Sequence, residues 1–72
     1  MKKHIIEYAD YEDADSGRIY DASRVIEKNG GKVCGSKADE EDGVAYIAFV
    51  CTDESLPKIL DGVKEDGWSQ YT

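Results

Sequence analysis

The segment from Val44 to Cys51 constrains the fold more than any other part of the chain. It reads VAYIAFVC and has no charged residue, and it is rich in the β-branched and aromatic residues that favour strands. An acidic run that ends in Asp42-Gly43 precedes it, and Asp-Gly is a strong hairpin-turn signal. We therefore expect a central strand that enters the sheet from a tight turn.

Three further segments have the character of strands. Residues 4–9 combine two isoleucines and a tyrosine without a breaker, and residues 68–72 alternate large and polar side chains. Residues 32–37 are short and mixed, with a lysine at each end, which is typical of a sheet edge. In the hairpin that joins this edge strand to the central strand, we expect Ser36 to pair near Val44.

A first amphipathic helix is predicted between the first two strands. We expect Asp15 or Ser16 to be its N-cap. Asn29-Gly30-Gly31 is a typical glycine C-cap and should end it. Its apolar side chains, spaced three and four residues apart, are Ile19, Ala22, Val25 and Ile26.

A second amphipathic helix is predicted after the central strand. Thr52, Asp53 or Ser55 should cap it, and Pro57 suits its first turn. It should end near Asp66-Gly67. Its apolar side chains are Leu56, Ile59, Leu60 and Val63.

The order strand, helix, strand, strand, helix, strand predicts one α+β domain over residues 1–72. We expect the ferredoxin-like βαββαβ topology, also called split βαβ, in which an antiparallel sheet carries two helices on one face. The first two strands would then be parallel, with the central strand between them. The side chains expected to face the helices are Ala45, Ile47, Phe49, Ile6 and Tyr8.

The opposite face of the central strand remains apolar although no helix covers it. An apolar patch on a small protein usually marks an interface, so we expect self-association, or contact with a partner, through this face. Trp68 or Tyr71 is expected to join it. RNA-binding modules stack bases on such aromatics, but they need basic residues beside them. The predicted self-association residues are Val44, Tyr46, Ala48 and Val50.

The charge of the chain is strongly negative: 16 Asp and Glu against 9 Lys and Arg give a formal net charge of -7. This balance argues against direct binding to nucleic acid, which depends on Lys and Arg. The predicted topology brings three acidic segments to the same end of the sheet. They are the turn after the first strand, the hairpin tip, and the turn after the second helix, which contains Glu65 and Asp66. The predicted partner-binding residues are Asp10, Glu12, Asp13, Asp15, Asp39, Glu40, Glu41 and Asp42.

Acidic loops also have ordinary explanations. They improve solubility, and acids before a helix interact favourably with its dipole. Metal binding is disfavoured, because an EF-hand that began at Asp13 would need a glutamate where the chain has Arg24. His4 is the only histidine, no catalytic or phosphate-binding motif is present, and we expect neither enzymatic activity nor a cofactor.

The two cysteines, Cys34 and Cys51, match no zinc or redox motif. Their expected separation in the hairpin exceeds the Cα distance of a disulfide, so we expect both to be reduced. We expect no secretory signal, because Glu7 interrupts the apolar residues near the N-terminus, and no apolar stretch of the sequence is long enough to cross a bilayer. These features predict a cytoplasmic protein.

Together these features predict a small non-enzymatic protein that inhibits a nucleic-acid-binding protein by occupying its basic groove. Carboxylates would stand in for phosphates. In size and acidity the chain is similar to phage-encoded inhibitors of host nucleases, including anti-CRISPR proteins, a similarity that rests on no shared motif. The alternative is a homodimeric regulatory or sensor domain that binds a small ligand or a partner through its open sheet face. A subunit of a larger assembly is a third possibility.

Overall fold

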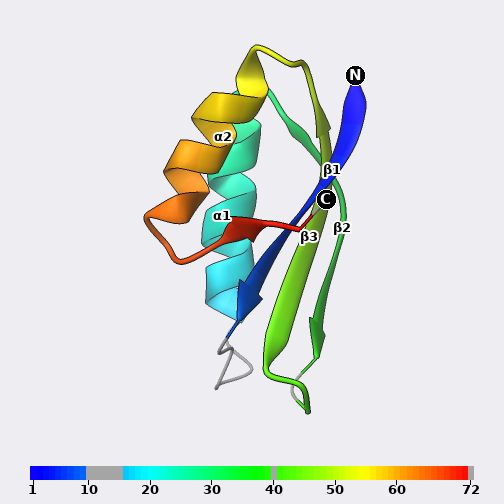
Figure 1. The fold of residues 1–72 in the computed structure, drawn as a ribbon, viewed down its shortest axis with the longest axis vertical. Helices are drawn as coiled ribbons and strands as arrows, with labels where there is room; N and C mark the ends of the chain where they lie inside the picture. The colour runs from blue at the N-terminus through cyan, green and yellow to red at the C-terminus, as the bar shows by residue number, and fades with distance from the viewer. Residues whose placement is uncertain (10–15, 40, 72) are drawn as a thin grey trace.

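The computed structural model describes residues 1–9, 16–39 and 41–71. Its sheet has the strand order β2-β3-β1-β4, and neighbouring strands are antiparallel. The predicted α+β class is confirmed, with four antiparallel strands and two helices (Figure 1). The elements are β1 (Lys2–Ala9), α1 (Ser16–Lys28), β2 (Lys32–Asp39), β3 (Val44–Cys51), α2 (Ser55–Lys64) and β4 (Ser69–Gln70).

Strand β3 is central, as predicted from its composition. It pairs with β1 from Ala9↔Val44 to Lys2↔Cys51, and it pairs with β2 on its other side. Because β1 and β2 are both antiparallel to β3, they run parallel to each other. The alternate side chains of β3 are buried and half-buried, so one side of this strand lies in the core.

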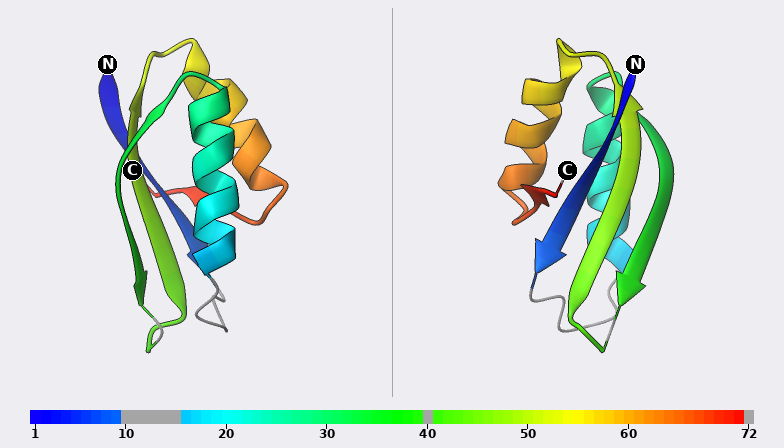
Figure 2. Two further views of the ribbon diagram at one scale, coloured as in Figure 1. Left: turned by 180° about the vertical axis from the view of Figure 1, so that it is seen from behind. Right: turned by 45° about the vertical axis from the view of Figure 1, so that its right-hand side comes forward.

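Both helices lie on the same side of the sheet (Figure 2). Of the side chains predicted to face the helices, four are buried and Tyr8 is half-buried against the core. The helices approach each other closely at Gly62, where a Cβ atom would lie 2.6 Å from Cγ1 of Val25. The buried residues of the core are Ile6, Ala22, Ile26, Ala45, Ile47, Phe49, Cys51, Ile59, Val63 and Trp68.

The end of α1 follows the sequence signal. Gly30 has a φ of 91° and the N–H of Gly31 donates to the carbonyl oxygen of Ile26 at 2.8 Å, which confirms the glycine C-cap. The start of α2 differs from the prediction, because its N-cap residue is Glu54, which makes no side-chain cap hydrogen bond. Of the three candidates, Thr52 accepts the N–H of Ser55 at its Oγ1 atom, at 3.2 Å. Asp15 lies outside the described residues.

The register predicted for the hairpin is wrong by three residues. Ser36 pairs with Ile47, and the partner of Val44 is Asp39. Strand β2 extends two residues further than expected and ends at Asp39. The Oδ1 atom of Asp39 accepts the N–H groups of Glu41 and Asp42, so the turn begins at this residue. The register shifts between Val33 and Gly35, so Cys34 occupies a β-bulge.

Both cysteines are free, with Cys34 exposed and Cys51 buried. Burial is the main cause that raises the pKa of the Cys51 thiol, and the Asp53 carboxylate raises it further. Among the helices in the described part of the chain, none is both long and apolar enough to cross a membrane.

The C-terminal segment forms a shorter strand than residues 68–72 would allow. Only Ser69 and Gln70 pair with β1, and the N–H of Tyr71 donates to the carbonyl oxygen of Ile5 at 2.7 Å. Trp68, which was considered for the open face, is instead in the core with 2% of its surface exposed. Its ring centroid lies 5.6 Å from that of Tyr8. The strand that we predicted therefore exists, but its tryptophan faces the helices.

Candidate functional site

The sheet face that the helices leave uncovered, here called the open face, is the first candidate site (Figure 2). The four predicted self-association residues of β3 are all half-buried. The strand registers place a residue of β1 and a residue of β2 beside each of them. These rows across the open face are Ala9-Val44-Asp39, Glu7-Tyr46-Lys37, Ile5-Ala48-Gly35 and Lys3-Val50-Lys32.

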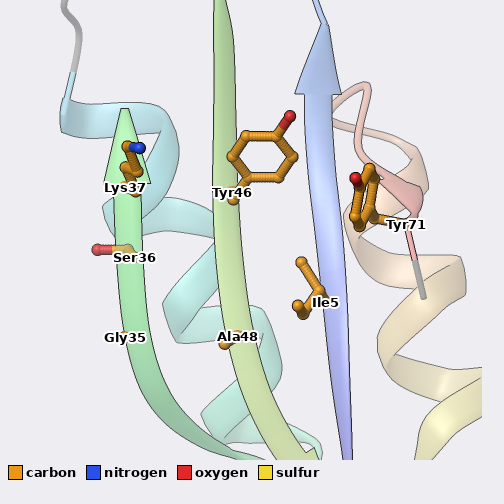
Figure 3. A pocket seen from close by; sticks show the side chains of 7 residues that line it. All are labelled: Ile5, Gly35, Ser36, Lys37, Tyr46, Ala48 and Tyr71. Carbon is orange, nitrogen blue, oxygen red and sulfur yellow. The ribbon is translucent and has the colours of Figure 1, made fainter. Parts of the chain in front are cut away.

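A hollow of about 400 Å³ lies on this face (Figure 3). Tyr46 and Tyr71 meet at its border edge to face, with ring centroids 5.3 Å apart and an interplanar angle of 75°. A Cβ atom on Gly35 would meet nothing within 4 Å, so the missing side chain helps to create the hollow. The lining residues are Ile5, Gly35, Ser36, Lys37, Tyr46, Ala48 and Tyr71.

Carboxylates lie near the Tyr46 phenol at the border of the hollow. The pKa of the Tyr46 phenol is raised, first by partial loss of its hydration, then by Tyr71 and by the carboxylates of Glu7, Asp42 and Asp39. This phenol therefore loses its proton less readily than a free tyrosine does. Three carboxylates act on one side chain, so the open face adjoins the acidic end of the molecule.

The second candidate site is this acidic end. The part of it that the structure describes is the hairpin between β2 and β3. The backbone N–H groups of Glu41 and Asp42 donate to Oδ1 of Asp39, at 3.1 Å and 3.2 Å. Asp39 is therefore a structural residue of the turn as well as a charge, while Glu41 and Asp42 are exposed. The other predicted partner-binding residues lie outside the described residues: Asp10, Glu12, Asp13, Asp15 and Glu40.

Lysines collect at the opposite end of the sheet. Lys2 pairs with Cys51, and Lys3 and Lys32 both pair with Val50, at the end of β3 far from the hairpin. Lys28 is in the last turn of α1, which ends on that side (Figure 1). Charge is thus unevenly distributed along the strands. Three residues reduce the difference in charge between the two ends. Lys37 lies near the hairpin, and Asp53 and Glu54 lie near the lysines.

His4, the one histidine of the chain, lies beside Phe49. His4 is half-buried, its ring centroid lies 5.8 Å from that of Phe49, and its Nε2 atom has no hydrogen-bond partner. In the part of the chain that the structure describes, no three His, Cys, Asp or Glu side chains are grouped closely enough to hold a metal ion.

Several residues of the open face escaped the sequence reasoning. Glu7, Lys37 and Gly35 join it through the registers of β1 and β2, and no local pattern specifies a register. Tyr71 was considered because the tail alternates large and polar residues, and this expectation is confirmed by its contact with Tyr46.

Comparison with known protein families gives no family model that matches the chain, and comparison with curated proteins gives no match. The function therefore has to be inferred from the two exposed features, the open face and the acidic end.

Proposed function

We propose that this chain is a ferredoxin-like, split βαβ domain that acts as a non-enzymatic protein-binding module. The element order βαββαβ supports this fold, as does the sheet order, which reads β4-β1-β3-β2 from the other edge. The positions of both helices on one face also agree with it. The proposed partner is a nucleic-acid-binding protein, whose basic groove receives the acidic end.

The observation that carries this proposal is the uneven distribution of charge along the strands. Glu41 and Asp42 are exposed at the hairpin end, while Lys2, Lys3 and Lys32 pair at the other end of β3. The N–H groups of Glu41 and Asp42 donate to Oδ1 of Asp39. Hydrogen bonds that order these residues before binding would lower the entropy cost of association, which supports presentation of the Glu41 and Asp42 carboxylates to a partner.

The proposed mechanism is charge mimicry. The carboxylates of the acidic end occupy positions in the groove that phosphates would otherwise hold, so the domain competes with nucleic acid. A net charge of -7 would steer the approach to a basic surface and accelerate association. Added salt screens this attraction, because the Debye length falls to about 8 Å at physiological ionic strength.

The test compares two pairs of neutralised acids at opposite ends of the domain. Glu41→Gln with Asp42→Asn removes two charges from the hairpin tip, and Asp53→Asn with Glu54→Gln removes two charges near the lysines. A captured nucleic-acid-binding protein should elute at clearly lower salt from the first variant, and at nearly the wild-type salt concentration from the second. Equal shifts for the two variants would contradict a role for the acidic end and indicate a general effect of net charge.

A further inference from the structure

The open face carries an excess of lysine that the composition of the chain conceals. The residues of its four rows include three lysines, Lys3, Lys32 and Lys37, and two acids, Glu7 and Asp39. The chain as a whole has 16 acids and 9 basic residues. All three lysines are exposed. This face therefore differs in the sign of its charge from the chain as a whole.

The charges of this face are also separated along the strands. Both acids lie in the two rows nearest the hairpin, while Lys3 and Lys32 flank Val50 in the row farthest from it. Two strand spacings of about 4.8 Å separate the Cα atoms of these lysines, so the two are about 10 Å apart. Their long side chains can converge on one anionic group above Val50. This end of the open face is therefore suited to an anion.

The hollow of about 400 Å³ adjoins this pair of lysines. Its floor is apolar, because Ile5 and Ala48 line it and Gly35 has no side chain. Tyr46 and Tyr71 stand at its border (Figure 3), and Tyr71 is 54% exposed, so its ring is available for stacking. Small-molecule sites have volumes of about 300–1,000 Å³ and combine an apolar lining with a few polar groups. The hollow and the lysines together have this character.

We propose that the open face binds a free nucleoside monophosphate, with its base in the hollow and its phosphate between Lys3 and Lys32. Bases stack on tyrosine rings, and the apolar floor of the hollow accepts a flat ring. Lysine ammonium groups bind phosphate as point charges. The acids near the hairpin repel the phosphate, so the ligand has one favoured direction along β3.

The charges around the hollow favour a free nucleotide over a strand of nucleic acid. A strand that continued along β3 toward the hairpin would meet the carboxylates of Asp39, Glu41 and Asp42. Binding of a strand depends on neutralising many phosphates with Lys and Arg, which a chain of net charge -7 does not favour. A single phosphate needs only the lysines of the last row.

The test is an NMR titration of the isotope-labelled chain with adenosine monophosphate (AMP), adenosine, inorganic phosphate and a short single-stranded oligonucleotide. AMP should shift the amide signals of the open face, and adenosine and phosphate should each bind about tenfold more weakly or less. Adenosine that binds as tightly as AMP would overturn the phosphate contact. AMP that shifts no signal of the open face at millimolar concentration would overturn the site. An oligonucleotide that binds more tightly than AMP would overturn the choice of a free nucleotide.

Two pairs of lysine variants test the phosphate contact. Lys3→Gln with Lys32→Gln should raise the Kd of AMP about tenfold and leave the Kd of adenosine unchanged. The matched control, Lys58→Gln with Lys64→Gln, removes two positive charges from α2 on the other side of the sheet. It should leave the Kd of AMP nearly unchanged. Equal losses of AMP affinity in the two variants would overturn the contact and indicate a general effect of net charge.

Substitutions at the hollow test the position of the base. Tyr71→Ala removes a stacking ring and should raise the Kd of both AMP and adenosine about tenfold. Gly35→Ile should prevent the binding of both by filling the hollow. It should leave the chain folded, since a Cβ atom at this position meets no neighbour within 4 Å. Wild-type affinity for AMP in the Gly35→Ile variant would overturn the proposal. None of these measurements involves a partner of the acidic end, so their outcome is independent of the proposed function.

Discussion

At the scale of single residues, Asp39 combines two roles that are easily confused. As an acid near the hairpin tip it belongs to the proposed partner-binding surface. As a hydrogen-bond acceptor it holds the turn, because its Oδ1 atom accepts the N–H groups of both Glu41 and Asp42. Neutralising the acidic run without preserving this acceptor would change the shape of the hairpin together with its charge.

Asp39→Ala should therefore lower the free energy of unfolding by about 1 kcal/mol, since two backbone donors lose their partner. Asp39→Asn keeps an oxygen acceptor and should cost much less. Urea denaturation of the two variants measures the difference. Equal losses would mean that the hydrogen bonds do not stabilise the turn.

At the scale of elements, strand β3 and the two helices could be predicted because their signals are local. The uncharged run of β3 predicts a central strand, but both of its faces are apolar, so its composition does not show which side chains enter the core. The structure buries Ala45, Ile47, Phe49 and Cys51. The register of β2 could not be predicted: it depends on Asp39 at the strand end and on a bulge that includes Cys34, and neither follows from periodicity. Alternation in the tail suggested a strand without showing which of its aromatics faces the core. Trp68 is buried against Tyr8, and Tyr71 reaches the open face.

Packing between the helices gives a prediction at this scale. Alanine is normally better than glycine in a helix by about 1 kcal/mol, but at Gly62 a Cβ atom would lie 2.6 Å from Val25 Cγ1. Gly62→Ala should therefore destabilise the domain by about 1 kcal/mol, because overpacking costs about 2 kcal/mol and the helix preference of alanine offsets about 1 kcal/mol of it. In a Val25→Ala background the same change should become stabilising. Thermal unfolding of the four proteins measures both effects, and a substitution that destabilises equally in both backgrounds would contradict close helix packing at this point.

At the scale of the whole molecule, the open face and the acidic end point in different directions. The open face lies to one side of the sheet, and the acidic end lies beyond the hairpin. Of the eight predicted partner-binding residues, the described part of the chain includes Asp39, Glu41 and Asp42. Glu65 and Asp66 were expected to join them, but the connection between α2 and β4, which contains these two residues, lies away from the hairpin end (Figure 1). The convergence of the acids outside the described residues stays a prediction.

The central claim is that the acidic end competes with nucleic acid for one groove. The most direct measurement captures a target with the wild-type chain at low salt, then titrates the complex with DNA or RNA of increasing length. We predict that nucleic acid displaces the chain, and that Glu41→Gln with Asp42→Asn lowers the concentration needed, while Asp53→Asn with Glu54→Gln does not. A complex that saturating nucleic acid leaves intact, with both molecules bound at once, would contradict the claim.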